Sequence, residues 1–242
     1  MSNQSVRLPA SGHAELHLAT RSGRVAVEAE ERSDLLIESD APLGDDRIEA
    51  DATGCVSVKS GRGGSGWLEV RCPIGTDVVV GTVSGKVELR GQLGAVRVTT
   101  VSGSAQVERA EHVDVRSVAG SIEIGRCAGR CRIQTASGRA VCGSAGDARV
   151  STMSGQIRLD EVTGSVKAQS ASGQIEVGAR GKGDVDVQTM SGSVRVQVPR
   201  GLRPSARLRS WVGTPRCDCD QGDDFEIAVN SLSGKIEVVP TS

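Results

Sequence analysis

The sequence predicts an all-β protein, a parallel β-solenoid of about nine coils of 17–21 residues with an N-terminal β cap. A Ser-x-Ser-Gly-like turn recurs nine times, and its glycine returns at intervals of 17 to 21 residues. Short stretches of alternating apolar and polar residues flank each turn, as is typical of strands with one buried face. With no Tyr, one Phe and two Trp, the core must consist of small aliphatic side chains, which suits the narrow interior of a solenoid. The turn glycines are Gly85, Gly103, Gly120, Gly138, Gly155, Gly173, Gly192, Gly213 and Gly234.

Each coil can be numbered so that its turn glycine occupies place eight. In the coil Val96–Val107, apolar residues then occupy places one, three, six, ten and twelve. The three-residue step from place three to place six indicates a corner between two strands. The glycine indicates a backbone with positive φ, and Ser or Thr at places five and seven offers hydroxyls to the backbone groups of the corner. Stacked coils would place equal residues over one another as parallel ladders.

Place six is apolar in every coil, like the places that alternate along the strands. We therefore expect its residues to stack in a continuous apolar column, with an abrupt change of volume only at Trp211. The column consists of Val83, Val101, Val118, Ala136, Met153, Ala171, Met190, Trp211 and Leu232.

The repeat predicts one continuous domain, with capping strands in residues 1–70 and solenoid repeats in residues 71–242. Before residue 70 the register of the repeat is lost, although short alternating runs persist. A degenerate coil is expected around residues 199–224, where Pro215 stands at place ten. Pro240, close to the end of the last strand, would hinder the addition of a further strand.

A competing interpretation makes each pair of strands an antiparallel hairpin, with two repeats forming one blade of a propeller-like array. Propeller blades run to about 40 residues and carry aromatic signatures. Two repeats here span only about 35 residues and contain almost no aromatic side chains, so the solenoid is favoured.

Composition limits the partners and the compartment. The 29 Lys and Arg nearly balance the 30 Asp and Glu, so the whole chain has no long-range attraction to nucleic acid or to an anionic membrane. No apolar run is long enough for a transmembrane segment, and the first ten residues do not resemble a signal peptide. We expect a cytoplasmic protein, or a cell-surface protein if the chain is the trimmed form of a longer one. The seven cysteines, an odd number without regular spacing, favour a reducing compartment.

Three stretches resemble the bacterial putative-adhesin family of β-strand-repeat domains of unknown function. They are Leu68–Leu89, the early unit Arg21–Val27 and the closing unit Ser231–Val238, which share the Ser-Gly-x-Val/Ile-x-Val pattern or its variants. The resemblance covers nearly the whole chain. It implies a single-stranded β-helix and brings no catalytic residues with it.

The reactive side chains are best interpreted as structural. Cys72, Cys131, Cys142 and Cys217 fall at apolar places of the repeat, where cysteine acts as a small buried hydrophobe. Cys127 lies in a turn of the pattern. His13, His17 and His112 are scattered and complete no zinc site or catalytic triad, so we expect neither a metal nor a cofactor. The acidic segment 218–226 lacks the spacing of a calcium loop and is expected to be a solvated loop.

One outward-facing pattern suggests a binding site. At place two, Arg132, Arg149 and Lys167 would stack as three cations on successive coils. Like charges on neighbouring strands are unfavourable unless solvent screens them or nearby carboxylates or an extended polyanion balance them. A second basic cluster lies near Trp211, at Arg200, Arg203, Arg207 and Arg209.

The function expected from the sequence is that of a non-enzymatic, adhesin-like binding or scaffold protein with a rigid, extended surface. Its partner would be another protein or an extended polymer, held by many weak contacts, and no specific nucleic acid is expected. The alternative is a structural scaffold that self-assembles end to end into a filament. A β-helix enzyme acting on polysaccharide is less favoured, because such enzymes use grooves with clustered charged residues and aromatic platforms.

Overall fold

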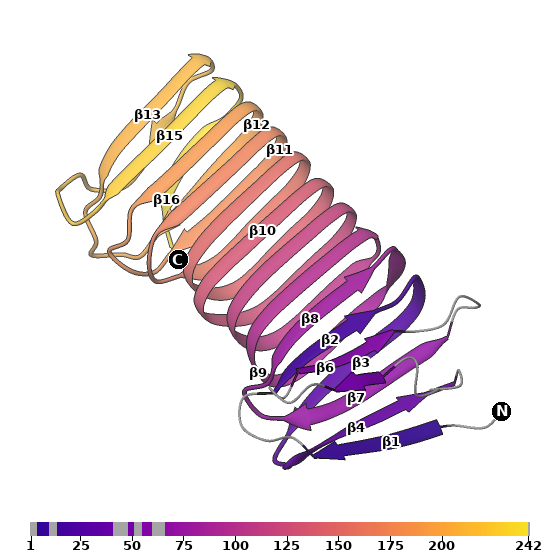
Figure 1. The fold of residues 1–242 in the computed structure, drawn as a ribbon. Helices are drawn as coiled ribbons and strands as arrows, with labels where there is room; N and C mark the ends of the chain where they lie inside the picture. Colours follow the sequence, from indigo (N-terminus) through magenta and orange to yellow (C-terminus); the bar gives the residue numbers. More distant parts are fainter. Residues whose placement is uncertain (1–3, 10–13, 41–47, 51–54, 60–65, 242) are drawn as a thin grey trace. The chain divides into compact units, whose positions relative to one another are not determined.

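The protein is all-β in the computed structural model, which describes residues 4–9, 14–40, 48–50, 55–59 and 66–241. Sixteen strands form a large, mostly parallel sheet, and this described part of the chain contains no helix (Figure 1). The prediction of an all-β, mostly parallel architecture is therefore confirmed. The structure falls into two compact units, residues 1–125 and 126–242, which are described separately. The boundary at residue 70 stays a prediction.

In the first unit, β2 and β3 already belong to the parallel ladder. β3 pairs in parallel with β9, with Gly23 opposite Gly85, and β2 pairs in parallel with β8. The expected loss of register before residue 70 is thus wrong for these two strands. The repeat was hidden because their corner carries Arg21 at place six in place of an apolar residue. The strands that belong to this unit are β1 (Gln4–Pro9), β2 (Glu15–Ala19), β3 (Ser22–Glu30), β4 (Asp34–Ser39), β5 (Ile48–Ala50), β6 (Cys55–Lys59), β7 (Trp67–Pro73), β8 (Asp77–Thr82), β9 (Ser84–Ser102) and the first part of β10 (Ser104–Val162).

Strands β6 and β7 lie on the other side of β2 and β3. Each pairs in parallel with its neighbour, β6 with β2 and β7 with β3. The antiparallel pairs are confined to this region, where β4 pairs with β1 and β7, and β5 pairs with β6. The segment that follows β2 and β3 along the chain is thus stacked outside them, before the chain returns to β8 and β9.

In the second unit, the strands stack in an order that differs from their order in the chain. β10, β11 and β12 pair in parallel, with Gly155, Gly173 and Gly192 directly opposite one another. β15 and β16 then pair with β12, and β13 and β14 pair with β15 and β16 (Figure 1). The strands after β10 are β11 (Val166–Ala179), β12 (Val185–Val198), β13 (Ser205–Val212), β14 (Arg216–Cys217), β15 (Glu226–Ser233) and β16 (Ile236–Pro240).

This order corrects two predictions about the end of the chain. The degenerate segment around residues 199–224 supplies the outermost strands β13 and β14, and does not lie between β12 and the last regular coil. Pro240 pairs with Val198 inside the stack, so it does not end the ladder. The physical reason is burial, because β15 places Ile227 and Val229 in the core, whereas β13 has no buried residue.

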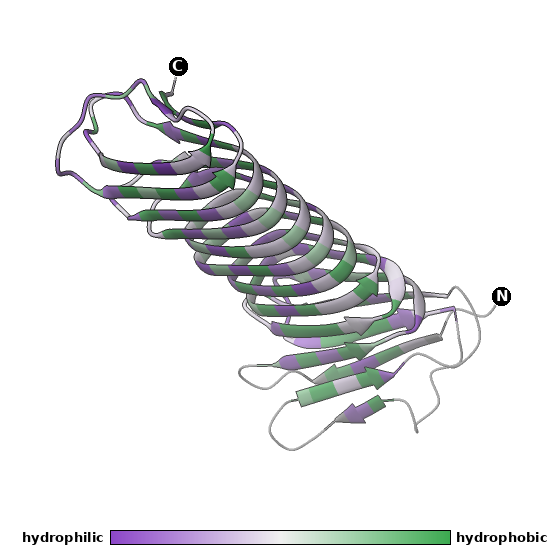
Figure 2. Ribbon diagram, turned by 90° about the horizontal axis from the view of Figure 1, so that it is seen from above, coloured by the Kyte–Doolittle hydropathy of each residue, from purple (hydrophilic) through white to green (hydrophobic). Residues whose placement is uncertain are grey.

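The core follows the predicted alternation, as Figure 2 shows along the strands. At places one, three, ten and twelve the side chains are buried, for example Val166, Ala168, Ile175 and Val177 of β11. Place six is different. Its large residues are exposed in both units, and Ala136 and Ala171 are half-buried, so the prediction that this apolar column belongs with the inward-facing places is wrong.

The corner hydroxyl at place five explains why place six faces outward. Thr152, Ser170, Thr189 and Ser231 are buried, and each donates a hydrogen bond of 3.0–3.3 Å to the carbonyl oxygen two residues later. Since place five points inward to make this bond, the next side chain must point outward. The predicted use of corner hydroxyls for backbone groups is confirmed at place five.

Replacing this hydroxyl by a methyl group should have opposite effects in the two units. We expect Thr152→Val to lower the free energy of unfolding by about 1 kcal/mol, because it removes the bond to the Ser154 carbonyl. Thr100 is equally buried, but its Oγ1 has no hydrogen-bond partner in the described structure. Thr100→Val should therefore be neutral or stabilise by up to about 1 kcal/mol. Urea unfolding of both variants measures the difference, and equal losses would contradict this account of the corner.

Candidate binding surfaces

Apolar residues, all but one of them exposed, form a row across the second unit. We call this row the apolar ridge; it consists of Met153, Ala171, Met190, Leu232 and Trp211, the place-six residues of five adjacent strands. Met153 is 67% exposed, Met190 57% and Trp211 87%. Large apolar side chains at such exposure, aligned on neighbouring strands, are typical of a surface that binds a partner.

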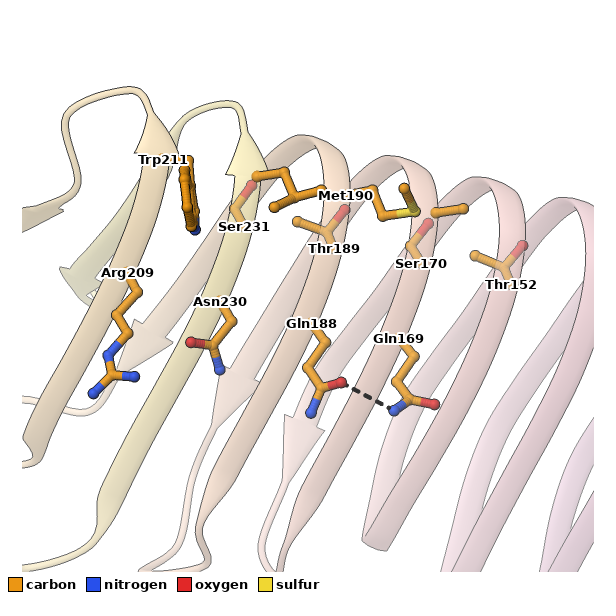
Figure 3. A pocket seen from close by; sticks show the side chains of 12 residues that line it. Thr152, Gln169, Ser170, Gln188, Thr189, Met190, Arg209, Trp211, Asn230 and Ser231 are labelled. Atoms are coloured by element: carbon orange, nitrogen blue, oxygen red, sulfur yellow. Dashed lines mark hydrogen bonds between the residues drawn. The ribbon is translucent and has the colours of Figure 1, made fainter.

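A polar row runs beside the ridge. We call it the amide row; it consists of Gln169, Gln188 and Asn230, with Arg209 at its end on β13 (Figure 3). The Nε2 of Gln169 donates to the Oε1 of Gln188 at 3.3 Å, and the Nε2 of Gln188 donates to the Asp186 carboxylate. Register of the parallel strands therefore holds these side chains at the spacing of the ladder.

The two rows enclose a groove of about 730 Å³. Its floor contains the corner hydroxyls of Thr152, Ser170, Thr189 and Ser231, which are already bonded to their own backbone. Recognition must then come from the walls. One wall offers a thioether and an indole, the other offers carboxamides that both donate and accept hydrogen bonds.

The predicted basic ladder is brought together in a separate depression. Arg132, Arg149 and Lys167 line one hollow of about 500 Å³, and Arg149 lies directly opposite Lys167 on the neighbouring strand. The Nε of Arg132 is buried without a hydrogen-bond partner in the described structure. Arg207, which the chain order placed next to Asp186 in this ladder, is separated from it by Ala228.

Carboxylates also line the depression. The Nζ of Lys167 lies 3.4 Å from the Oδ2 of Asp186. Asp147 accepts hydrogen bonds from the backbone N and the Oγ of Ser165, which hold the pKa of its carboxyl below the ordinary value. The surface is therefore of mixed charge, and nearby carboxylates can balance its cations without a bound polyanion.

The cysteines lie where the pattern predicts, with one exception. Cys72, Cys131 and Cys142 are buried and Cys217 is half-buried, whereas Cys127, expected in a turn, is buried in β10. Burial raises the pKa of Cys72 to about 11. Hydrogen bonding with the thiols of Cys127 and Cys142, together with burial, raises the pKa of Cys131. These thiols stay protonated at neutral pH and are poor nucleophiles.

The groove was missed because its apolar wall has the same residue types as the core. The available signal was place four, where Gln169, Gln188 and Asn230 are all carboxamides. The acidic segment 218–226 was expected to be a solvated loop, and its Asp224 accepts a hydrogen bond from the backbone N of Arg203 at 2.9 Å. Of the sequence-predicted histidines, His13 lies outside the described residues.

Comparison with known proteins agrees with this architecture. The family model described as Toastrack DUF4097 matches residues 3–212 of the chain. No curated protein has a matching sequence. No described helix has the length and apolar character needed to cross a bilayer.

Solved structures with a similar fold include proteins titled as adhesins. A "putative adhesin" from Parabacteroides merdae has a TM-score of 0.50 and 13% identity, over 99% of this chain and 96% of that chain. Another "putative adhesin", from Parabacteroides distasonis, has a TM-score of 0.46 and 9% identity, over 98% and 97% of the two chains. At 13% identity, the likeness to the first supports the fold alone.

Proposed function

The chain belongs to the Toastrack DUF4097 family, and from this membership and the exposed groove we propose that it is a non-enzymatic, adhesin-like binding protein. We further propose that it folds as a single-stranded β-helix of about nine coils with an N-terminal β cap. The in-register parallel ladders within each unit support this architecture. The cytoplasmic location expected from the sequence stays a prediction.

The observation that carries the proposal is the exposure of the apolar ridge. Trp211 leaves 87% of its surface accessible, next to Leu232 on the adjacent strand β15, with Met190 one strand further along. Keeping such side chains in water gives up the free energy that burial would provide, about 1.5–3 kcal/mol for each large apolar residue. A partner that covers them recovers that free energy, and Trp is the residue type most enriched at interaction hot spots.

The partner that fits best is an extended polypeptide. Its backbone carries alternating N–H and C=O groups, which the donor and acceptor atoms of the amide row can meet. Its apolar side chains can pack on the flexible thioether of Met190, which adapts to different shapes. The groove residues in the described structure include no carboxylate, whereas glycoside hydrolysis requires a pair of them, so the surface favours binding over that chemistry.

Selection of linear peptides from a displayed library on the immobilised chain tests this function. Selected peptides should bind the Trp211→Ser variant at least about 30-fold more weakly, the loss expected when one aromatic hot spot of about 2 kcal/mol is removed. Val101→Ser is the matched control, because Val101 is also an exposed place-six residue but lies in the first unit. Equal binding to wild type and Trp211→Ser would exclude the groove as the site.

A second candidate surface is the basic ladder, favoured by the buried Arg132 Nε without a partner in the described structure. An anionic polymer would bind there through Arg132, Arg149 and Lys167. Reversing all three to Glu should abolish retention on heparin-type resin if the ladder holds polymers. Unchanged retention would show that the basic ladder does not bind anionic polymers.

Self-assembly is the alternative function, and the position of β13 favours it. Among the described strands, β13 pairs with β15 only, so one of its edges can accept a strand from another copy. Sedimentation over a range of protein concentrations separates the two functions, since a monomer at high concentration excludes assembly through this edge.

A further inference from the structure

Three metal-ligating side chains converge in the first unit, and none of them lines the groove or the depression. Glu15 and His17 alternate on β2, so both point to the same face of the sheet. Cys55 begins β6 and lies directly opposite Glu15 in the parallel register. The Nε2 of His17 lies 2.7 Å from the Oε1 of Glu15, and the ligand atoms of all three residues lie within 4.8 Å of one another.

No pattern in the sequence indicates this group, because Cys55 is about 40 residues from His17 along the chain. The pairing of β2 with β6 brings them together. Residues directly opposite on neighbouring strands lie about 5 Å apart at the backbone, which is the span that a bound ion closes between two side chains. Backbone register therefore sets the positions of Glu15 and Cys55. His17, two residues after Glu15 on the same strand, supplies the third ligand.

We propose that Glu15, His17 and Cys55 bind one zinc ion. Zinc takes thiolate sulfur, imidazole nitrogen and carboxylate oxygen at about 2.0–2.3 Å in tetrahedral geometry. Ligand atoms around such an ion are separated by about 3.3–3.8 Å, so small side-chain rotations would bring the three ligand atoms, which lie within 4.8 Å of one another, into that range. Calcium and magnesium are disfavoured, because they prefer oxygen ligands throughout.

Three protein ligands leave the fourth position of the zinc ion for a water molecule or a donor atom of a partner. Glu15 is exposed and the other two ligands are half-buried, so solvent reaches the site. The ion would also join β6 to β2, the strand that leads into the parallel ladder. Zinc binding should thus stabilise the folded first unit, because the ligands converge only when the two strands are paired.

Cobalt titration of the untagged, reduced chain tests the site directly. We expect one Co²⁺ ion per chain and a thiolate-to-cobalt charge-transfer band in the near ultraviolet, with the band removed when Zn²⁺ is added. Cys55→Ser should abolish the band, and His17→Ala should weaken binding by at least about tenfold. Cys219→Ser and His112→Ala are the matched controls, a thiol and an imidazole outside the group, and both should keep the band.

A second measurement guards against variants that fold poorly. Zinc should raise the thermal unfolding midpoint of the wild-type chain and leave that of Glu15→Gln shifted less or not at all. A charge-transfer band that persists in Cys55→Ser, or a wild-type chain that shows neither the band nor a zinc-dependent midpoint, would overturn the proposal. None of these outcomes depends on the apolar ridge, so the test is independent of the proposed function.

Discussion

Gly173→Ala should strongly destabilise the second unit. Gly173 has a φ of +136°, a conformation that side-chain-bearing residues rarely adopt. A β-carbon at this position would also lie 1.9 Å from the carbonyl oxygen of Gly155 on the neighbouring strand. Backbone strain costs about 1–3 kcal/mol, and the clash would force β10 and β11 apart and weaken their ladder. We expect a total loss of at least about 3 kcal/mol, measured by urea unfolding.

Two other glycines separate the causes of this loss. Gly201 has a φ of +95° with open space where a β-carbon would lie, so Gly201→Ala should show the strain alone, about 1 kcal/mol. A β-carbon on Gly81 would make only an ordinary contact at 4.0 Å, so Gly81→Ala should be close to neutral. If Gly173→Ala were no more harmful than Gly201→Ala, close stacking of the glycines would not be what restricts this position.

The in-register stacking of the turn glycines is the feature that the sequence predicts best. Glycine at a fixed interval has one simple physical cause: each coil turns its corner directly over the corner of the neighbouring coil, where a β-carbon does not fit. The pairing of Gly155 with Gly173 and of Gly173 with Gly192 confirms that register in the second unit. Hydrophobic alternation along the strands is predicted equally well, because successive side chains of a β-strand point to opposite faces of the sheet.

The orientation of the corner could not be predicted, because composition and burial disagree there. Met153 and Met190 are apolar and exposed, whereas Thr152 and Thr189 are polar and buried. A hydroxyl that bonds its own corner carbonyl loses little by entering the core, so its polarity no longer decides which side it faces. The groove escaped sequence analysis for this reason, whereas Arg149 and Lys167, at places with plain alternation, lie opposite each other as the repeat predicts.

The order of strands at the chain ends was also beyond the sequence. β7 pairs with β3, and β13 pairs with β15. Each therefore lies at a place in the stack that its position along the chain does not predict. A repeat pattern states which segments resemble one another and leaves open which of them are adjacent. No residue of β13 is buried, and its Arg207, Arg209 and exposed Trp211 suit a place at the outer edge of the stack.

A buried carboxylate provides the second large effect. Glu88 on β9 is only 5% exposed and accepts a bond of 2.5 Å from Arg24, while Lys86 and Arg90 also pair with it. Arg24 and Lys86 lie directly opposite each other on β3 and β9, so without the carboxylate two like charges would face one another. Hydrogen bonding and attraction to these cations, Lys86 first, lower the pKa of Glu88 from 4.5 to about 2.

Glu88→Gln should therefore cost the first unit about 2 kcal/mol at neutral pH. The pKa difference alone corresponds to on the order of 3 kcal/mol, and solvent around the half-exposed cations reduces it. Because the pKa is lowered in the folded state, this stability is complete above pH 4.5 and is lost as the pH falls towards 2. Urea unfolding should show wild type and Glu88→Gln far apart at pH 7 and nearly equal near pH 2. The exposed Glu123→Gln is the control, and a gap between wild type and Glu88→Gln that did not shrink in acid would contradict the role of the charge.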